Sequence, residues 1–221
     1  MRVLVIAPHA DDEILGVGGT IAKYVEEGNQ VDVCIVTVGQ TPMFSSDAIA
    51  AVRHEALEAH KLLGVHESIF LEFPAVLLSQ VPRYEINGKL CEVITKVRPD
   101  IVFIPHFGDM HYDHMLVAQA AMVAVRPINE CTVKEVYAYE TLSESEWNVP
   151  HAANAFIPNT YIDISKQVGQ KREAMSCYRS QVKMFPHPRS IEALDALAKL
   201  RGSTVGVCAA EAFCLLRRIE R

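Results

Sequence analysis

The chain has 221 residues, half of them apolar, and this length and composition predict one well-buried α/β domain spanning residues 1–221. Its formal charge of −6 at pH 7, with lysines and arginines scattered along the chain, argues against a surface that binds the phosphates of nucleic acid. No apolar run approaches the roughly 20 residues of a membrane-spanning helix, and the run at the N-terminus is wrongly flanked for a secretory signal, so we expect a cytoplasmic protein without an integral membrane segment.

Apolar runs typical of strands alternate with helical patterns over the first 140 residues. The expected strands cover residues 2–7, 31–38, 68–73, 100–105 and 133–140. The expected helices cover about 14–27 and 47–63, a segment ending near Val97, and about 115–125. This alternation predicts βαβ units around a parallel sheet.

The pattern weakens after residue 141. Residues 143–159 hold the single tryptophan, two prolines and few periodic apolar residues, which is typical of an irregular loop. Helices are expected again at about 166–179 and 191–200.

Two stretches rich in histidine and aspartate follow two of the predicted strands. "APHADDE" occupies residues 7–13 and "PHFGDMHYDH" residues 105–114. Because ligands of open parallel sheets bind outside the carboxyl ends of the strands, we expect both stretches at one crevice. Burying so many ionisable groups without compensation costs several kcal/mol per charge, and a divalent cation would compensate them.

Three of these residues are predicted to hold the cation: His9, Asp12 and His114. Two imidazoles and one carboxylate leave a fourth position open, as in catalytic rather than structural zinc sites, and the same ligands also suit Fe²⁺. Taken alone, His9 is explained as a hydrogen-bonded surface histidine and the acids at 11–13 as the first turn of a helix. The joint occurrence of H-x-D-D and H-x-D-H at two strand ends favours the metal site.

These motifs resemble those of a known family. "PHADDE", followed by "GVGGTIAKYVEEG" and later by "HYDH", resembles the PIG-L/LmbE superfamily of metal-dependent N-deacetylases, which includes N-acetylglucosaminyl deacetylases. Segments at 53–65, 171–181 and 201–213 also resemble that family. The resemblance implies a Rossmann-like three-layer α/β fold with a mostly parallel central sheet flanked by helices. It further implies a homo-trimer or hexamer that removes acetyl from an N-acetylated amino sugar or glycoconjugate.

The resemblance also implies a role for each motif residue. The zinc ligands of the family correspond to His9, Asp12 and His114. Asp11 corresponds to the general base that takes a proton from the attacking water. His111 corresponds to the residue that supports the oxyanion or the leaving amine, with Asp113 expected to orient and charge it.

Substrate contacts are expected at two further residues. Arg53 matches a basic residue of the family on the second helix, with a solvated helix arginine as the alternative. His187, in "FPHPRS", either lines the substrate mouth or is a plain surface histidine. Ala75, in "FPAVLL", stands where family members acting on glucosamine derivatives tend to carry an acid, so one sugar contact is absent here. Glu211 either bonds near the pocket or, as we favour, anchors the last segment.

Other functions remain open. An amidase acting on another amide, such as a thiol-sugar conjugate, would use the same metal-activated water, whereas a non-catalytic sugar-binding or metal-binding module would have no need of Asp11. A nucleotide-dependent oxidoreductase is disfavoured, because "GVGG" follows three acids and lacks the GxGxxG fingerprint. We expect those glycines to allow close helix packing. The motifs leave open which N-acetylated sugar is used.

Overall fold

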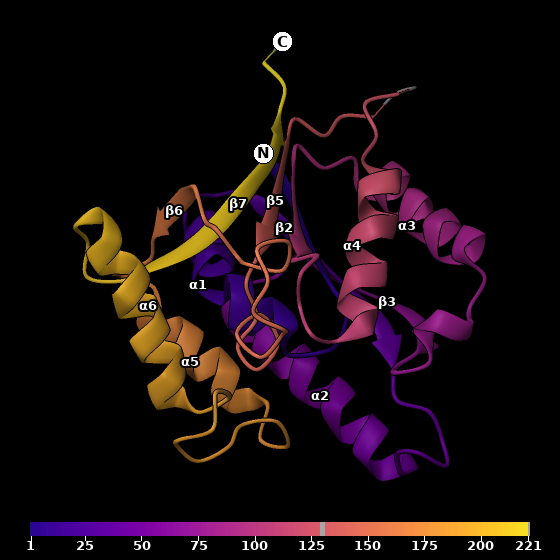
Figure 1. The fold of residues 1–221 in the computed structure, drawn as a ribbon, viewed down its shortest axis with the longest axis horizontal. Helices are drawn as coiled ribbons and strands as arrows, with labels where there is room; N and C mark the ends of the chain where they lie inside the picture. The colour runs from indigo at the N-terminus through magenta and orange to yellow at the C-terminus, as the bar shows by residue number, and fades with distance from the viewer. Residues whose placement is uncertain (129–130, 221) are drawn as a thin grey trace.

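A seven-stranded sheet in the order β3-β2-β1-β4-β5-β7-β6 forms the centre of the computed structural model, which describes residues 1–128 and 131–220 (Figure 1). Five strands are mutually parallel: β1 (Arg2–Ala7), β2 (Gln30–Val38), β3 (Glu67–Pro74), β4 (Ile101–Pro105) and β5 (Glu135–Tyr139). β7 (Ala210–Arg218) runs antiparallel to both β5 and β6 (Thr160–Asp163). The sheet is therefore mostly parallel, as predicted.

Helices cover both faces of this sheet. One core cluster packs α1 (Asp12–Glu26), α2 (Ser46–Leu63), α5 (Val168–Cys177) and α6 (Ile191–Val205) on one face. A second cluster packs α3 (Arg83–Val97), α4 (Tyr112–Ala124) and the short 3₁₀ helix η1 (Leu78–Gln80) on the other. In β1, Val3 and Val5 point into the first cluster and Leu4 and Ile6 into the second, so the strand is apolar throughout.

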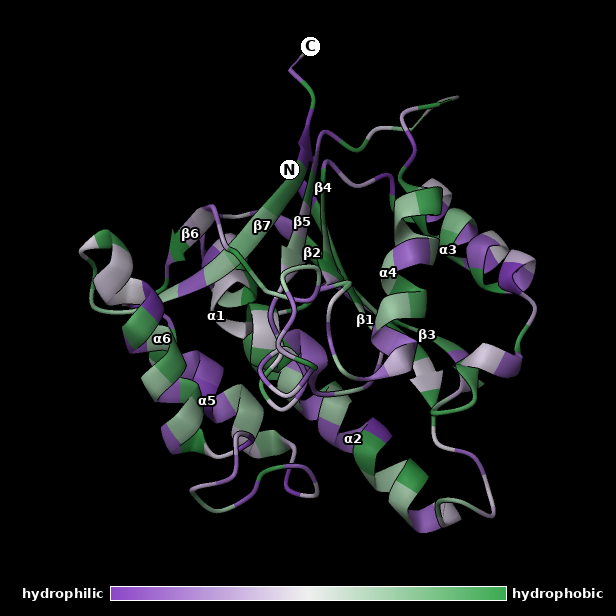
Figure 2. Cartoon of the chain, viewed as in Figure 1, coloured by the Kyte–Doolittle hydropathy of each residue, from purple (hydrophilic) through white to green (hydrophobic). Residues whose placement is uncertain are grey.

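The predicted three-layer α/β fold is confirmed by this arrangement. Figure 2 shows apolar residues along the central strands and a mixture of apolar and polar residues on the helices around them. Within the described residues, no helix combines the length and the apolar character needed to cross a bilayer.

The sequence prediction missed the two strands at one edge of the sheet. β6 has only four residues, none of them buried, so its pattern is too short to be recognised. In β7 the second half carries two leucines followed by two arginines, none of them buried, which hides the strand from a search for buried runs. The predicted loop at 143–159 is present, with turns but no helix or strand.

Glycines let α1 lie close to the sheet. A Cβ on Gly16 would stand 2.2 Å from the ring of Tyr139, and one on Gly19 would stand 2.6 Å from Ile164. The predicted packing role of these glycines is therefore confirmed. Close packing fixes the start of α1 relative to the carboxyl end of β1.

A buried ion pair joins α1, α5 and β7. Lys171 Nζ donates to Glu211 Oε1 at 2.5 Å and to the carbonyl of Leu15 at 2.8 Å. The Glu211 carboxylate also accepts the backbone N–H groups of Gly19 and Thr20 at 2.9 and 2.7 Å. Glu211 thus anchors the last strand to the middle of α1.

We predict that Lys171→Met lowers the free energy of unfolding by about 3–5 kcal/mol, because Glu211 would keep its charge in the interior without a cation. Urea denaturation measures the change. Lys89→Met is the matched control, since Lys89 pairs with Glu92 at the exposed surface and its loss should cost less than about 1 kcal/mol. Equal effects of the two substitutions would contradict the anchoring role.

Candidate metal centre

The loop after β1 and the loop after β4 meet because these strands are neighbours in the sheet. Their carboxyl ends lie where the chain's strand order changes direction, which is the usual ligand site of such folds. The first loop leads into α1 and the second into α4, so the acids and histidines of both motifs lie at the beginnings of these two helices.

Short hydrogen-bonded turns hold the residues of the first motif in place. The backbone N–H of His9 donates to Asp12 Oδ2 at 2.9 Å, and that of Asp11 donates to Glu13 Oε2 at 3.1 Å. Asp11 has a φ of 119°, a region that non-glycine residues seldom adopt. The carboxylates of Asp12 and Glu13 therefore support a strained turn, from which the Asp11 side chain contacts Arg189.

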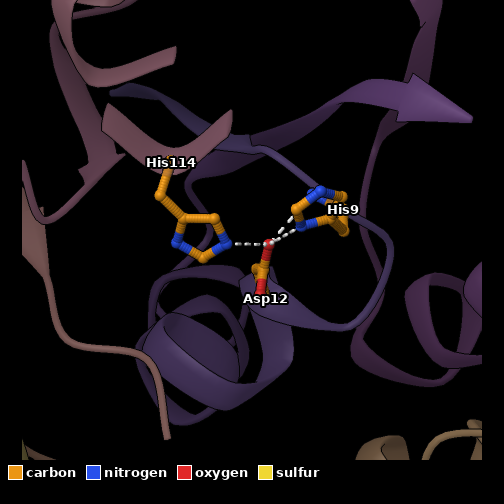
Figure 3. A group of neighbouring side chains, drawn as sticks. All are labelled: His9, Asp12 and His114. Atoms are coloured by element: carbon orange, nitrogen blue, oxygen red, sulfur yellow. Dashed lines mark hydrogen bonds and ion pairs between the residues drawn. The ribbon is translucent and has the colours of Figure 1, made fainter. Parts of the chain in front are cut away.

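The structure brings the three predicted metal ligands together (Figure 3). Asp12 Oδ2 lies 3.3 Å from His9 Nδ1 and 3.1 Å from His114 Nε2. Two atoms that are each about 2.1 Å from a tetrahedral ion lie about 3.4 Å apart. The observed separations are close to that value.

Two buried atoms of this cluster lack a hydrogen bond. Asp12 Oδ1 and His114 Nε2 are buried and make no hydrogen bond within the described part of the chain. Buried polar atoms without partners are rare, because each forfeits its hydration. A divalent ion would satisfy both, so these residues fit a metal.

Each histidine is held on its other nitrogen by a second carboxylate. His114 Nδ1 lies 2.8 Å from Asp109 Oδ2, and Asp109 Oδ1 accepts the hydroxyl of Ser145 at 2.5 Å. His9 Nε2 lies 3.2 Å from Asp113 Oδ2. Such outer carboxylates fix the ring orientation and tautomer of ligating histidines.

Asp113 therefore serves a different neighbour from the one expected. Its carboxylate accepts from the backbone N–H of Val76 at 2.7 Å and faces His9, whereas its contact with His111 runs from the backbone N–H of Asp113 to Nδ1 at 3.1 Å. Asp113 orients His111 through the main chain, and its carboxylate hydrogen-bonds His9 while its charge acts on both rings.

Opposite charges within the cluster stabilise one another. Burial would lower the pKa of His114, but the carboxylates of Asp12 and Asp109 outweigh burial and raise it to about 10. Burial alone would raise the pKa of Asp12, but the adjacent imidazoles hold it well below its usual range. The hydrogen bonds of His9 to Asp113 and Asp12 likewise raise its pKa against the effect of burial.

His111 lies beside the cluster with a different electrostatic character. Burial, followed by the positive charge of His9, lowers its pKa to about 4, so its ring is neutral at pH 7. Because Nδ1 accepts the N–H of Asp113, the ring hydrogen resides on Nε2. The expected protonated His111 is replaced by a neutral ring that can donate one hydrogen bond.

Arg189, which the sequence analysis missed, holds Asp11. Its Nη1 donates to Asp11 Oδ2 at 2.9 Å, and its Nε donates to the hydroxyl of Ser143 at 2.9 Å. Burial is the largest cause that raises the pKa of Asp11 to about 8, and the Arg189 charge opposes it. The segment "FPHPRS" drew attention only through its histidine.

A cavity of about 330 Å³ lies beside the cluster, and its lining includes His9, Asp11, His111 and Arg189. Arg53 also lines it, with its guanidinium paired to Glu72 and 4.2 Å from the centre of the Phe70 ring.

The two other positions weighed for substrate contacts differ in their placement. Ala75 lies in the cavity wall, so the absent acid would have faced the cavity. His187 is not among the lining residues; its ring contacts Trp147 and accepts the N–H of Arg189.

Residues 4–125 match the model of a protein family described as GlcNAc-PI de-N-acetylase, or PIG-L. The chain belongs to this family. The resemblance seen in the sequence motifs is thereby confirmed.

Several known proteins are similar to the PIG-L chain. The uncharacterized deacetylase YaiS of Escherichia coli is 28% identical, over 75% of this chain and 83% of that protein. The 1D-myo-inositol 2-acetamido-2-deoxy-alpha-D-glucopyranoside deacetylase of Saccharomonospora viridis is 27% identical, over 97% of this chain and 95% of that protein. The crystal structure of the conserved protein TT1542 from Thermus thermophilus matches with a TM-score of 0.79 and 29% identity. The match covers 99% of this chain and 96% of that one.

We predict that Asp109→Asn lowers the affinity for Zn²⁺ about 10–100-fold, because His114 would lose the carboxylate that orients it. Calorimetric titration of chelator-treated protein with Zn²⁺ measures the affinity. Asp47→Asn, which removes an exposed carboxylate from the first turn of α2, is the control and should leave the affinity unchanged. Equal affinities for wild type and Asp109→Asn would refute the ligand assignment of His114.

Proposed function

We propose that this PIG-L protein is a zinc-dependent hydrolase that removes an acetyl group from an N-acetylated amino sugar or its conjugate. The observation that carries the proposal is the position of Asp11. This carboxylate adjoins the ligand Asp12, lines the cavity and takes no part in the proposed ligand set. Family membership supports the reaction class, and the names of the relatives support an acetamido sugar as substrate.

His9, Asp12 and His114 would hold the ion, with Fe²⁺ as an alternative to Zn²⁺. A divalent ion bound there lowers the pKa of a coordinated water toward about 7 and polarises the amide carbonyl. The fully buried Asp12 and His114 exclude solvent from the inner side of the site, so an approaching amide must enter from the cavity.

Asp11 is the proposed general base. Arg189 fixes one of its oxygens, and burial raises the pKa of Asp11 to about 8, which makes the ionised carboxylate a stronger base than an exposed aspartate. Asp11 accepts a proton from the water that attacks the amide carbon. The same proton passes to the amide nitrogen as the carbon–nitrogen bond breaks, leaving acetate and a free amine.

His111 is the proposed partner of the developing negative charge. Nε2–H is the one N–H donor of this neutral ring, because Nδ1 accepts the N–H of Asp113. A donor fixed in this way can bond the oxyanion or the leaving amine without first having to change its own orientation. Asp113 contributes by holding His9 and by fixing the tautomer of His111.

Related amides would meet the same groups, so an amidase acting on a thiol-sugar conjugate is the nearest alternative. A non-catalytic sugar-binding or metal-binding module would not need Asp11 to be held by Arg189 at the cavity. Substrate contacts by Arg53 and His187, the homo-trimeric or hexameric state and the cytoplasmic location remain predictions.

A screen of N-acetylated amino sugars for primary amine release tests the function. We expect release by the zinc-loaded protein, loss of release with a chelator and recovery when Zn²⁺ is added back. Protein that binds one zinc per chain and releases amine from no N-acetylated sugar or related amide would favour the binding module.

We predict that Asp11→Asn lowers kcat about 10²–10⁴-fold and leaves the zinc content unchanged, because it removes a base and no ligand. The matched substitution Asp12→Asn should lower both the zinc content and kcat. Amine release and elemental analysis measure the two quantities. Loss of zinc in Asp11→Asn, with Asp12→Asn retaining it, would reverse the roles assigned to the two acids.

A further inference from the structure

The cavity beside Asp11 has two walls of different chemistry. The polar groups of the site form one of them. The other consists of apolar side chains from the loop after β2, the first turns of α2, β3 and the residues that follow β3: Phe44, Ala48, Ile49, Val52, Phe70 and Val76. In the proposed function the reacting acetamido group lies at the first wall, which leaves the second wall open to another part of a ligand.

The apolar stripe of α2 shows why this wall is available. Ile49, Val52, Ala56, Ala59 and Leu63 recur at intervals of three and four residues, which places them on one face of the helix. Ala56, Ala59 and Leu63 are buried in the protein core, whereas Ile49 and Val52 are only half-buried and line the cavity. The stripe is therefore covered by the protein along the second half of the helix only.

The loop before α2 extends the same surface. Phe44 is 39% exposed and lines the cavity. A Cβ on Gly39 would stand 3.1 Å from the ring of Phe44 and 3.2 Å from Ile49, so the bare glycine lets these two side chains approach. The loop thus continues the apolar surface of the helix.

Polar groups near this wall already have partners. Arg53 is paired with Glu72 and lies over Phe70. The hydroxyl of Thr37 donates to the carbonyl of Pro8, and that of Ser180 donates to Glu55. A sugar hydroxyl placed against Phe44, Ile49 or Val52 would face apolar side chains, and desolvating a hydroxyl without a partner is costly.

We propose that the natural substrate carries an apolar group of several carbons that packs against Phe44, Ile49 and Val52. The inference rests on the proposed function, since the reacting amide must lie at Asp11 for the apolar group to reach α2. The group is either an alkyl or aryl aglycone of the amino sugar or, in place of the acetyl group, a longer acyl chain that the same site would remove. A cavity of about 330 Å³ is within the range of small-molecule sites.

Two series of synthetic substrates test this inference on the zinc-loaded protein. One series lengthens the aglycone from methyl to hexyl on N-acetylglucosamine, and the other lengthens the N-acyl chain of glucosamine from acetyl to hexanoyl. We expect kcat/KM to rise about fourfold per methylene along one series until the cavity is filled, because each buried methylene gains transfer free energy. The series that rises identifies which part of the substrate is apolar.

A pair of variants locates the effect. Ile49→Asn should reduce the hexyl-to-methyl ratio of kcat/KM, or the corresponding acyl ratio, about tenfold. Leu57→Asn places the same group on the exposed face of α2, outside the cavity lining, and should leave the ratio at the wild-type value. The ratio is insensitive to partial unfolding, which lowers both rates equally.

The outcomes separate this inference from the proposed function. Amine release with no dependence on chain length in either series overturns the apolar group and leaves the deacetylase intact. An equal loss of the ratio in both variants overturns the assignment to the α2 wall. No amine release from any member of either series overturns the proposed function, and this inference with it.

Discussion

The carboxylate of Asp12 is the interaction on which the site depends. One oxygen, Oδ2, accepts the N–H of His9 and faces an imidazole nitrogen of both His9 and His114, while Oδ1 is buried without a hydrogen bond. A buried charge in this position is tolerated only when opposite charges surround it. The protein supplies them by ending β1 and β4 side by side, so that one histidine from each loop reaches the same acid.

The surrounding fold keeps this acid where it is. Behind it, the fully buried Glu13 accepts the hydroxyl of Tyr178 at 2.5 Å and faces Nε2 of His60 at 3.3 Å, so α5 and α2 both secure the first turn of α1. Farther along α1, the Lys171–Glu211 pair engages the backbone of the same helix. These contacts make α1 a rigid support, and rigid supports are what precise catalytic geometry requires.

Much of this could be predicted from the sequence because it is encoded locally. The strands β1 to β5 are short apolar runs, and the motif residues follow β1 and β4 directly, so chain order and parallel pairing were enough to bring His9, Asp12 and His114 to one crevice. The partner of Asp113 was not predictable in this way. A nitrogen of His9 and one of His111 both lie within 4.8 Å of the Asp113 carboxylate, and the oxygen that accepts the N–H of Val76 is the one that bonds His9.

Arg189 was missed for a related reason. It lies 178 positions from Asp11 in the sequence, and nothing in "FPHPRS" distinguishes an arginine that returns to the site from one in solvent. His187 attracted attention because imidazole is a common catalytic group, yet its ring serves the turn that positions Arg189. Side-chain chemistry identifies candidate residues, but long-range packing decides which of two neighbours reaches the site.

Ala75 and the apolar face of α2 both make the lining of the cavity apolar. Ala75 is 8% exposed and adjoins Val76, whose N–H already binds the Asp113 carboxylate. An acid at position 75 would be desolvated close to Asp113, and its repulsion would act on the same charge that holds His9. Ile49 and Val52 also face the cavity, and the two arginines of its lining, Arg53 and Arg189, are already paired with Glu72 and Asp11. A small apolar residue at position 75 avoids this repulsion and matches the apolar side chains of Ile49 and Val52 in the same cavity lining.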